Sequence, residues 1–426
     1  MITTSNTIFL PPFPESIIVN EGLGANITFD QDKTYRFRII SFAAFASTML
    51  DFDGNNQQVI MIDSSYVDQV QATQLRISPA QRYDVLISVP RVRTCKAEAA
   101  SNYPFLLSLD INRDYTDNAT QAVWPYNYTG YLVTNLTGAY PEDVVDLWQP
   151  ADDAAFAPLD GASALGPVSE TITLDFDFCF DVNGLPRACF NNQTYIEQKV
   201  PTLYSVATTG LDNTNPIIYG DVNPYVLPLG SVVTIVINNL DAAIHPFHLH
   251  GHQFQVLERP GSNAGQWDGQ ETNFAAQPPR RDTIAVYANS YAVLRIAVTY
   301  PGVFLFHCHI EWHVEMGLTA TLIQAPEELR NITFPADHIE NCILQNIPYQ
   351  GNAAGNTQDV LDTSDFNTVP PVYYNGPGFL EKNPVCQLDR EPKAMSVKRA
   401  GSVSQARSLK LAFQLHYPDP WNLPTG

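Results

Sequence analysis

Two short segments hold seven of the nine histidines of this chain. The first is HPFHLHGH at 245–252, and the second is HCHIEWH at 307–313, which contains a cysteine, Cys308. Apolar residues flank both segments in a pattern typical of β-strands. Because successive side chains of a strand face opposite ways, Cys308 must point away from both His307 and His309. The sequence therefore requires a fold in which neighbouring strands carry ligand-type side chains on both faces.

The same alternation divides the ligand-type residues between two sites. A thiolate with two imidazoles in a trigonal arrangement, and a weak or absent axial ligand, is typical of blue copper. A cluster of imidazoles alone suits copper that binds oxygen. Since one strand takes part in both sites, we expect electrons to cross the peptide from the cysteine to either flanking histidine. The first site collects Cys308, His245 and, past a turn, His313; the second collects His248, His250, His307 and His309.

A structural interpretation and a zinc interpretation compete with copper. A single buried cysteine or histidine is usually only a core residue, but seven ligand-type residues with consistent parity rarely coincide. Closed structural zinc sites take four ligands, often from a Cys-x-x-Cys pair, and the chain has no such pair. We therefore favour copper, and we expect His252, His338 and His416 to be structural.

Strand patterns dominate the rest of the chain. Charged residues make up only 16%, and short apolar or alternating runs are separated by Pro, Gly, Asn and Asp. Such a pattern favours an all-β chain with two Greek-key β-sandwiches. We assign one domain to residues 1–140, an exposed acidic linker to 141–168, a second domain to 169–345, and a polar tail to 346–426. We expect the tail to wrap the surface or to be disordered.

The charge and the sequons indicate where such a chain works. A net charge of −21 argues against nucleic acid or an anionic membrane as partner. No segment approaches the roughly 20 apolar residues of a membrane-spanning helix, and the first residues lack the pattern of a signal peptide. Frequent Asn-x-Ser/Thr sequons fit a glycosylated, secreted or cell-wall protein. The sequons lie at Asn26, Asn118, Asn127, Asn135, Asn192 and Asn331.

The cysteine spacing predicts one disulfide bond. Cys179 and Cys189 flank FDVNGLPRA, in which the Asn-Gly pair is a hairpin signal, so a cross-strand disulfide bond is expected there. Cys342 and Cys386 are candidates for a second bond. Cys95 has no partner if the cysteine between the histidines stays a thiolate.

These motifs resemble those of multicopper oxidases of the fungal laccase and iron-transport ferroxidase type. The resemblance is strongest in HPFHLHGH and HCHIEWHVEMGL, and it continues through PPFPESIIVNEG, SPAQRYDVLI, KVPTLYSV and RRDT. It covers roughly residues 11–325. The resemblance implies cupredoxin-like domains, the second and third of a family that has three.

The resemblance also implies a role for each ligand. Its mononuclear copper takes His245, Cys308 and His313, with Leu318 at the axial position, where no side-chain atom coordinates. An absent axial ligand generally raises the copper potential. Met316 lies two residues before the axial position. The trinuclear copper cluster takes His248, His250, His307 and His309 from this chain.

Three carboxylates have matches in the family. Glu15 matches the acid that in laccases contacts a phenol beside the exposed histidine, where it would accept the phenolic proton. Asp241 matches one carboxylate of the ferroxidase iron site, but Pro11 stands where ferroxidases have their other key acid. Glu311 resembles the proton donor for oxygen reduction. For Glu15 and Asp241 the alternative is a solvated surface acid without a catalytic role.

The resemblance therefore predicts a copper-dependent, laccase-like oxidation of phenolic or pigment-precursor substrates, coupled to reduction of dioxygen to water. The first alternative is an Fe(II) ferroxidase of iron uptake. The absence of a C-terminal membrane span counts against it, because uptake ferroxidases are usually tethered. The second alternative is a copper-binding fragment without enzymatic activity.

The number of histidines departs from the family. The family's oxygen site takes eight, four from the last domain and four from the first, whereas residues 1–244 contain none. We therefore expect that the chain begins inside the second of three cupredoxin domains, and that a signal peptide is absent together with the first.

The chain as written is expected to hold at most one copper tightly and to show no sustained oxygen uptake. All three mononuclear ligands lie in one domain, whereas the other four histidines lack the opposing half of their cluster. Elemental analysis of copper-loaded residues 1–426 and an oxygen electrode test this. A full complement of copper with continuous oxygen uptake would contradict it.

Overall fold

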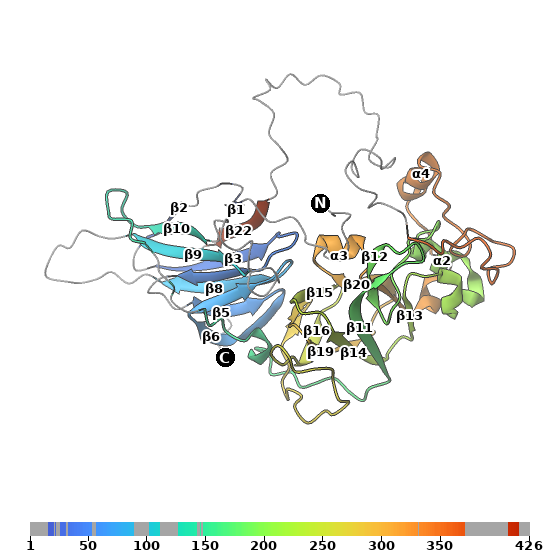
Figure 1. The fold of residues 1–426 in the computed structure, drawn as a ribbon, viewed down its shortest axis with the longest axis horizontal. Coiled ribbons are helices and arrows are strands. Elements are labelled where there is room, and N and C mark those ends of the chain that lie inside the picture. The colour runs from blue at the N-terminus through green and yellow to red at the C-terminus, as the bar shows by residue number, and fades with distance from the viewer. Residues whose placement is uncertain are drawn as a thin grey trace, which may run out of the picture.

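The computed structural model describes residues 16–20, 22, 26–30, 33–52, 57–88, 102–110, 127–142, 145, 148–330, 332–370 and 408–416. Two β-sandwiches, each of a six-stranded and a five-stranded sheet, make up the fold. They lie side by side in Figure 1, where the first is mostly blue to teal and the second is green to orange. The prediction of an all-β chain with two sandwich domains is confirmed.

In the first sandwich, every second residue of β3 is buried, which is the pattern of a strand with one face in the core. Its six-stranded sheet has the order β1-β22-β3-β8-β5-β6, and its five-stranded sheet has the order β2-β10-β9-β4-β7. The strands are β1 (Ser16–Val19), β2 (Asn26–Thr28), β3 (Thr34–Ser41), β4 (Thr48–Phe52), β5 (Gln57–Ile62), β6 (Ser65–Ala72), β7 (Gln74–Ile77), β8 (Arg82–Ser88), β9 (Tyr103–Leu109), β10 (Asn127–Val133) and β22 (Ser408–His416).

In the second sandwich, β18, β19 and β21 are buried along almost their whole length. Its sheets have the orders β12-β11-β14-β19-β16-β17 and β13-β21-β20-β15-β18. The strands are β11 (Glu170–Phe180), β12 (Pro186–Phe190), β13 (Pro224–Leu227), β14 (Val232–Asn239), β15 (His245–Leu249), β16 (Phe254–Glu258), β17 (Arg280–Arg281), β18 (Thr283–Val286), β19 (Ser290–Ala297), β20 (Gly302–Cys308) and β21 (Thr319–Gln324).

The helices are short and lie outside the sheets. They are α2 (Thr202–Thr208), α3 (Glu311–Glu315) and α4 (Ala336–Leu344), with 3-10 turns at Asp153–Ala155, Gly210–Thr214, Pro216–Tyr219 and Pro326–Leu329. In the described part of the chain, no helix has the length and apolarity needed to cross a membrane.

The tail differs from the expectation at residues 408–416, whereas residues 346–370 pack on the second sandwich, as a tail that wraps the surface would. Residues 408–416 form β22, which runs parallel to β1 and antiparallel to β3 in the first sandwich. Within it, SLKLAFQLH alternates apolar residues, a strand pattern that the polar composition of the surrounding tail obscured. Residues 346–370 pack on the second sandwich, where the Val200 amide donates to the Ala353 carbonyl and Asn352 is fully buried.

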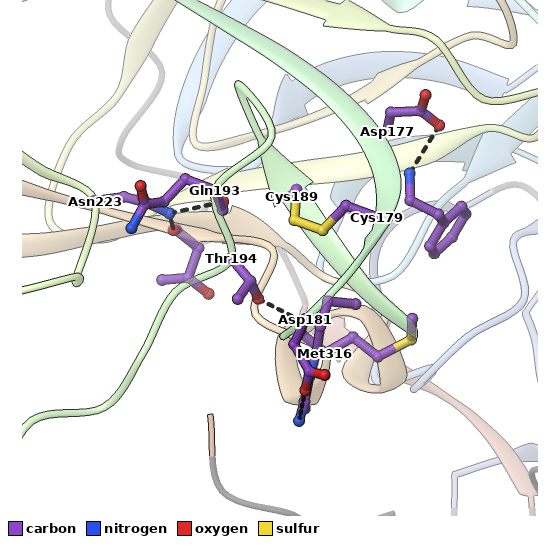
Figure 2. The surroundings of a disulfide bond; sticks show 11 residues. Asp177, Cys179, Asp181, Cys189, Gln193, Thr194, Asn223 and Met316 are labelled. Carbon is purple, nitrogen blue, oxygen red and sulfur yellow. Dashed lines mark hydrogen bonds and ion pairs between the residues drawn. A yellow bond between two sulfur atoms is a disulfide. The ribbon is translucent and has the colours of Figure 1, made fainter. Parts of the chain in front are cut away.

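The predicted disulfide bond between Cys179 and Cys189 is present and joins β11 to β12 (Figure 2). The two strands pair antiparallel, and their Cα atoms at the cysteines lie 6.0 Å apart. Cys342 is buried in α4. Cys95 and Cys386 lie outside the described residues, so the second disulfide bond stays a prediction.

The linker packs between the domains instead of lying exposed along its length. The Asp68 amide donates to the Ala157 carbonyl at 2.9 Å, and the Ala164 amide donates to the Ala276 carbonyl at 3.3 Å. Phe156 and Asp153 are both buried. A buried carboxylate needs a partner, and the second sandwich supplies it.

Five side chains form an ionic network between the domains, here called the interdomain clamp: Asp63, Tyr83, Asp153, Arg259 and Arg281. Arg281 is fully buried and donates through Nε and Nη2 to the carboxylate of Asp63, both at 3.0 Å. It also pairs with Asp153, which lies 2.9 Å from Arg259 Nη2. Since a buried guanidinium without a carboxylate is very costly, the clamp fixes the two sandwiches against each other.

The clamp predicts a loss of stability in acid. Burial raises the pKa of Asp153, but Arg259 and Arg281 outweigh burial and hold that pKa below its ordinary 3.8. The ionised Asp153 therefore stabilises the fold fully above about pH 5. This stabilisation is lost as the pH falls below 3.8 and through the lowered pKa of the folded chain. Thermal unfolding at a series of pH values measures it.

Asp153→Asn should cost about 3–5 kcal/mol at neutral pH and flatten the acid slope, because a buried cation loses its partner. The matched control is Asp160→Asn, which breaks an exposed pair with Arg280 and should cost at most about 1 kcal/mol. Equal costs and identical pH profiles for the two variants would show that the clamp does not hold the domains.

Candidate metal centre

The pairing of β15 with β20 places the ligand-type residues. Phe247 faces Cys308 and His248 faces His307 across the two antiparallel strands. Paired residues point to the same side of a sheet, and neighbours along the strand point to opposite sides. Cys308 therefore faces the core with Phe247, whereas both histidines face the other side. The structure thus gives the parity that the sequence predicted.

One of the two sites is a compact buried group of His245, Cys308 and His313. Cys308 Sγ lies 3.9 Å from His245 Nδ1 and 3.7 Å from His313 Nδ1, and the two Nδ1 atoms are 3.2 Å apart. Three ligand atoms thus converge on one point. Among the described residues, no other group of ligand-type side chains is as compact.

Aromatic rings close this site off from water. The ring of Phe176 lies 4.5 Å from that of His245, and the ring of Phe178 lies 5.3 Å from that of His313. Leu318 is fully buried, and its carbonyl accepts from the Cys308 amide at 3.1 Å. The surroundings of the three ligand side chains are therefore apolar. They restrict the side-chain positions and offer few hydrogen-bond partners that would compete with a metal.

Burial also sets the protonation of the ligands. It raises the pKa of the Cys308 thiol, and the nearby Ile310 amide only partly offsets this. It lowers the pKa of His313 well below its ordinary value. The imidazole is thus already in the neutral, ligating form, whereas the thiol must release its proton when a metal binds.

The other site gathers histidines from both strands and the segment that follows β20. The rings of His248 and His250 lie 4.9 Å apart, and His250 Nε2 lies 2.9 Å from His307 Nε2. Burial lowers the pKa of His307 to about 4. Nδ1 of His309 is buried and has no hydrogen-bond partner among the described residues. Closely spaced imidazoles with an unpaired nitrogen suit a metal cluster.

The donor sets fit copper. A buried thiolate with two imidazoles is the trigonal set of blue copper, and a group of imidazoles suits copper as well. Structural zinc sites take four converging ligands, but the compact site offers three.

Asp241 lies directly beside the compact site. Nε2 of His245 donates to Asp241 Oδ2 at 2.9 Å, which leaves Nδ1 for the metal. Burial raises the pKa of Asp241, but the bond to His245 and the Ala243 amide outweigh burial and lower it to about 2. The Asp241 side chain is 24% exposed, whereas His245 is closed off. The carboxylate therefore connects the solvent to a ligand.

The other predicted residues are less directly placed. Glu311 Oε1 lies 4.0 Å from His309 Nδ1 and its side chain is 56% exposed, so its role as proton donor stays a prediction. Glu15 lies outside the described residues. His252 stacks on Tyr300 with ring centroids 4.6 Å apart, which agrees with a structural role.

The disulfide hairpin braces the loop that follows α3, a contact that the sequence did not reveal. The Ala188 amide and Thr194 Oγ1 both donate to the carbonyl of Met316, at 3.1 and 2.9 Å (Figure 2). Gly317 has φ +97°, and a Cβ there would lie 2.0 Å from Thr194 Oγ1. The chain between His313 and Leu318 can therefore pass the hairpin only with glycine at this position.

The first sandwich touches α3 from the other side. The Glu311 amide donates to the Ala44 carbonyl at 3.0 Å, and the rings of Phe45 and Trp312 meet edge to face at 6.1 Å. His313 follows Trp312 directly in the same helix. The first sandwich thus helps to hold the helix that carries His313.

Two β-sandwich domains with these two sets of ligands define a copper protein of cupredoxin-like fold. The chain belongs to the multicopper oxidases, whose family models match residues 3–129 and 195–328. Copper is thus the cofactor of the family.

The similar proteins include fungal iron-transport enzymes. The chain is 38% identical over 376 residues to "Iron transport multicopper oxidase fetC" of Epichloe festucae, covering 87% of this chain and 59% of that one. It is 37% identical to FET3 of Gibberella zeae, covering 87% and 60%. The chain therefore spans about three fifths of the length of these relatives.

Among solved structures, Fet3p, "a Multicopper Oxidase that Functions in Iron Import", matches with a TM-score of 0.77 and 31% identity, covering 85% of this chain and 69% of that one. A laccase from Botrytis aclada matches with a TM-score of 0.64 and 24% identity, covering 76% and 57%. The laccase match supports the fold alone.

Cys308→Ser should abolish the intense blue colour of the copper-loaded chain and leave the fold intact. The colour arises from the thiolate–copper bond, whereas the sandwich core does not depend on that bond. Visible absorption measures the first effect, and circular dichroism the second. A serine variant that stayed blue would show that the ligand is assigned wrongly.

Proposed function

We propose that this chain forms part of a copper-dependent oxidase that removes one electron at a time from Fe(II) and delivers the electrons to dioxygen. The support comes from the iron-transport relatives at 38% and 37% identity and from the carboxylate beside His245. Cys308 and His307, one from each of the two ligand groups, lie on opposite faces of one sheet.

The single observation that carries the proposal is the hydrogen bond from His245 to Asp241. Asp241 Oδ2 accepts from both His245 Nε2 and the Ala243 amide, and hard cations prefer carboxylate oxygen such as Oδ1. With a pKa of about 2, Asp241 is ionised near neutral pH. Its negative charge stabilises Fe(III) more than Fe(II), which favours the loss of the electron.

Copper held by His245, Cys308 and His313 would supply the one-electron acceptor for this reaction. The chain's own residues bring the substrate close to it, because one hydrogen bond separates Asp241 from His245. They also keep water out, since Phe176 and Phe178 cover the ligands. On the other face, Glu311 is the proposed source of protons for the reduction of dioxygen.

Oxidation of phenols, which the sequence analysis placed first, is the second candidate. Its support was Glu15, which lies outside the described residues, and the laccase resemblance, which in structure reaches 24% identity. The iron-transport relatives are more similar, so they favour the alternative that the sequence analysis placed second.

We further propose that the chain works outside the cell. Three sequon asparagines, Asn26, Asn127 and Asn192, are exposed and accessible to glycosylation. The disulfide bond between Cys179 and Cys189 also suits an oxidising compartment.

Fe(II) should bleach the blue colour of the copper-loaded chain faster than a dimethoxyphenol does in stopped-flow mixing. Asp241→Ala should lower the rate of bleaching by Fe(II) on the order of 100-fold, because the substrate loses its position beside His245. The same variant should leave the phenol rate nearly unchanged.

Glu15→Ala is the matched variant, and it should slow only the phenol. Asp241→Asn keeps a side chain of the same size without the charge, so it should resemble Asp241→Ala with Fe(II). The iron proposal fails if Fe(II) bleaches Asp241→Ala at the original rate.

A further inference from the structure

We propose that Arg82, which belongs to the domain without copper ligands, is a positioning residue for His248 on the other domain. It acts through Asp282 and Thr283, which hold the His248 ring. The inference rests on the copper chemistry of the family and is independent of whether Fe(II) or a phenol is oxidised.

The contacts of His248 fix which of its nitrogens is free for a metal. His248 pairs with Thr283 across β15 and β18, so its ring lies beside that residue. Nδ1 is 2.9 Å from the Asp282 carbonyl oxygen and 3.0 Å from Thr283 Oγ1. A carbonyl oxygen can only accept, so Nδ1 carries the proton and Nε2 keeps its lone pair.

The Thr283 hydroxyl strengthens this arrangement. It donates to Asp282 Oδ1 at 2.9 Å, so the lone pairs of Oγ1 are what His248 meets. The same Oδ1 is 3.6 Å from His248 Nδ1, too far for a hydrogen bond. The carboxylate of Asp282 therefore lies near the proton on His248 Nδ1 but does not accept a hydrogen bond from it.

Arg82 is what keeps that carboxylate in place. Its Nη1 donates to Asp282 Oδ1 at 2.6 Å and its Nη2 donates to Oδ2 at 2.5 Å, a bidentate pair across the domain boundary. Such a pair fixes both the position and the rotation of the carboxylate. Arg82 is itself held, because Nη1 also donates to the Ala80 carbonyl at 3.0 Å.

Asp63, from the same domain as Arg82, grips the main chain at this point. Its Oδ2 accepts from the amides of Asp282 and Thr283, both at 3.2 Å. The carbonyl that receives the His248 proton is thus fixed from the first sandwich as well. A domain with no ligand of its own sets the direction of a ligand on its neighbour.

Loss of Arg82 should release the Asp282 carboxylate to compete for the proton on Nδ1. The ring would then turn, and Nε2 would leave its direction toward the neighbouring rings of His250 and His307, which lie 4.9 and 5.7 Å away. Changing an outer partner of a metal-binding histidine typically costs 10–100-fold in metal affinity.

The test uses the whole 426-residue chain with Arg82→Gln and Arg82→Lys. The control is Arg280→Gln. Arg280 lies in β17, and this variant breaks its pair with Asp160 in the linker, a pair that involves no histidine. The first readout is the His248 ring N–H resonance in ¹H–¹⁵N spectra of the metal-free chain, assigned with His248→Gln. The second is the affinity for Cu(II) bound after the blue site is full.

Arg82→Gln should shift the ring N–H resonance and speed its exchange with solvent, and it should weaken Cu(II) binding about 10-fold or more. Arg82→Lys should restore part of both effects, and Arg280→Gln should change neither. If Arg82→Gln does not fold, Thr283→Val removes one acceptor from Nδ1 while keeping the volume, and the same shift is expected. An unchanged resonance or an unchanged Cu(II) affinity in the folded variant overturns the proposal.

Discussion

The register of β15 against β20 is the constraint on which the metal chemistry depends. Phe247 faces Cys308 and His248 faces His307, so a sulfur ligand and an imidazole ligand lie on opposite sides of one peptide. A slip of one residue would exchange the two faces, which would put Cys308 among the histidines and His307 in the core. The fully buried Phe247, Phe306 and Cys308 oppose such a slip, because their burial stabilises only this register.

The sequence alone could predict the fold class and how the ligands are grouped, because both depend on local patterns. Strand alternation has a period of two, so the letters HCH suffice to separate Cys308 from its neighbours. The hairpin between Cys179 and Cys189 is equally local, since its turn residues and its cysteines lie within eleven positions. What surrounds each ligand was beyond such patterns.

The supports of the site depend on contacts between distant parts of the chain, and no periodicity reveals these. The motif RRDT does not indicate that Arg281 pairs with Asp63, which lies 218 residues earlier. Likewise, the sequence around Gly317 does not indicate that its backbone packs against Thr194. The acidic composition of the linker suggested exposure. Asp153 is nevertheless buried, because it forms ion pairs with the buried side chains of Arg259 and Arg281. The choice between Fe(II) and a phenol was equally hard to predict, because Glu15 and Asp241 are both acids and each is matched by resemblance alone.

The contact of Ala44 and Phe45 with α3 has a consequence for how related chains diverge. A loop insertion near Phe45 would shift Trp312 and with it the position of His313, even if every metal ligand stayed the same. Two homologues with identical histidine motifs would then differ in colour or in the ease with which they accept an electron. An alignment of the motifs would record no difference between them, because the variation lies in the first sandwich, outside both histidine segments.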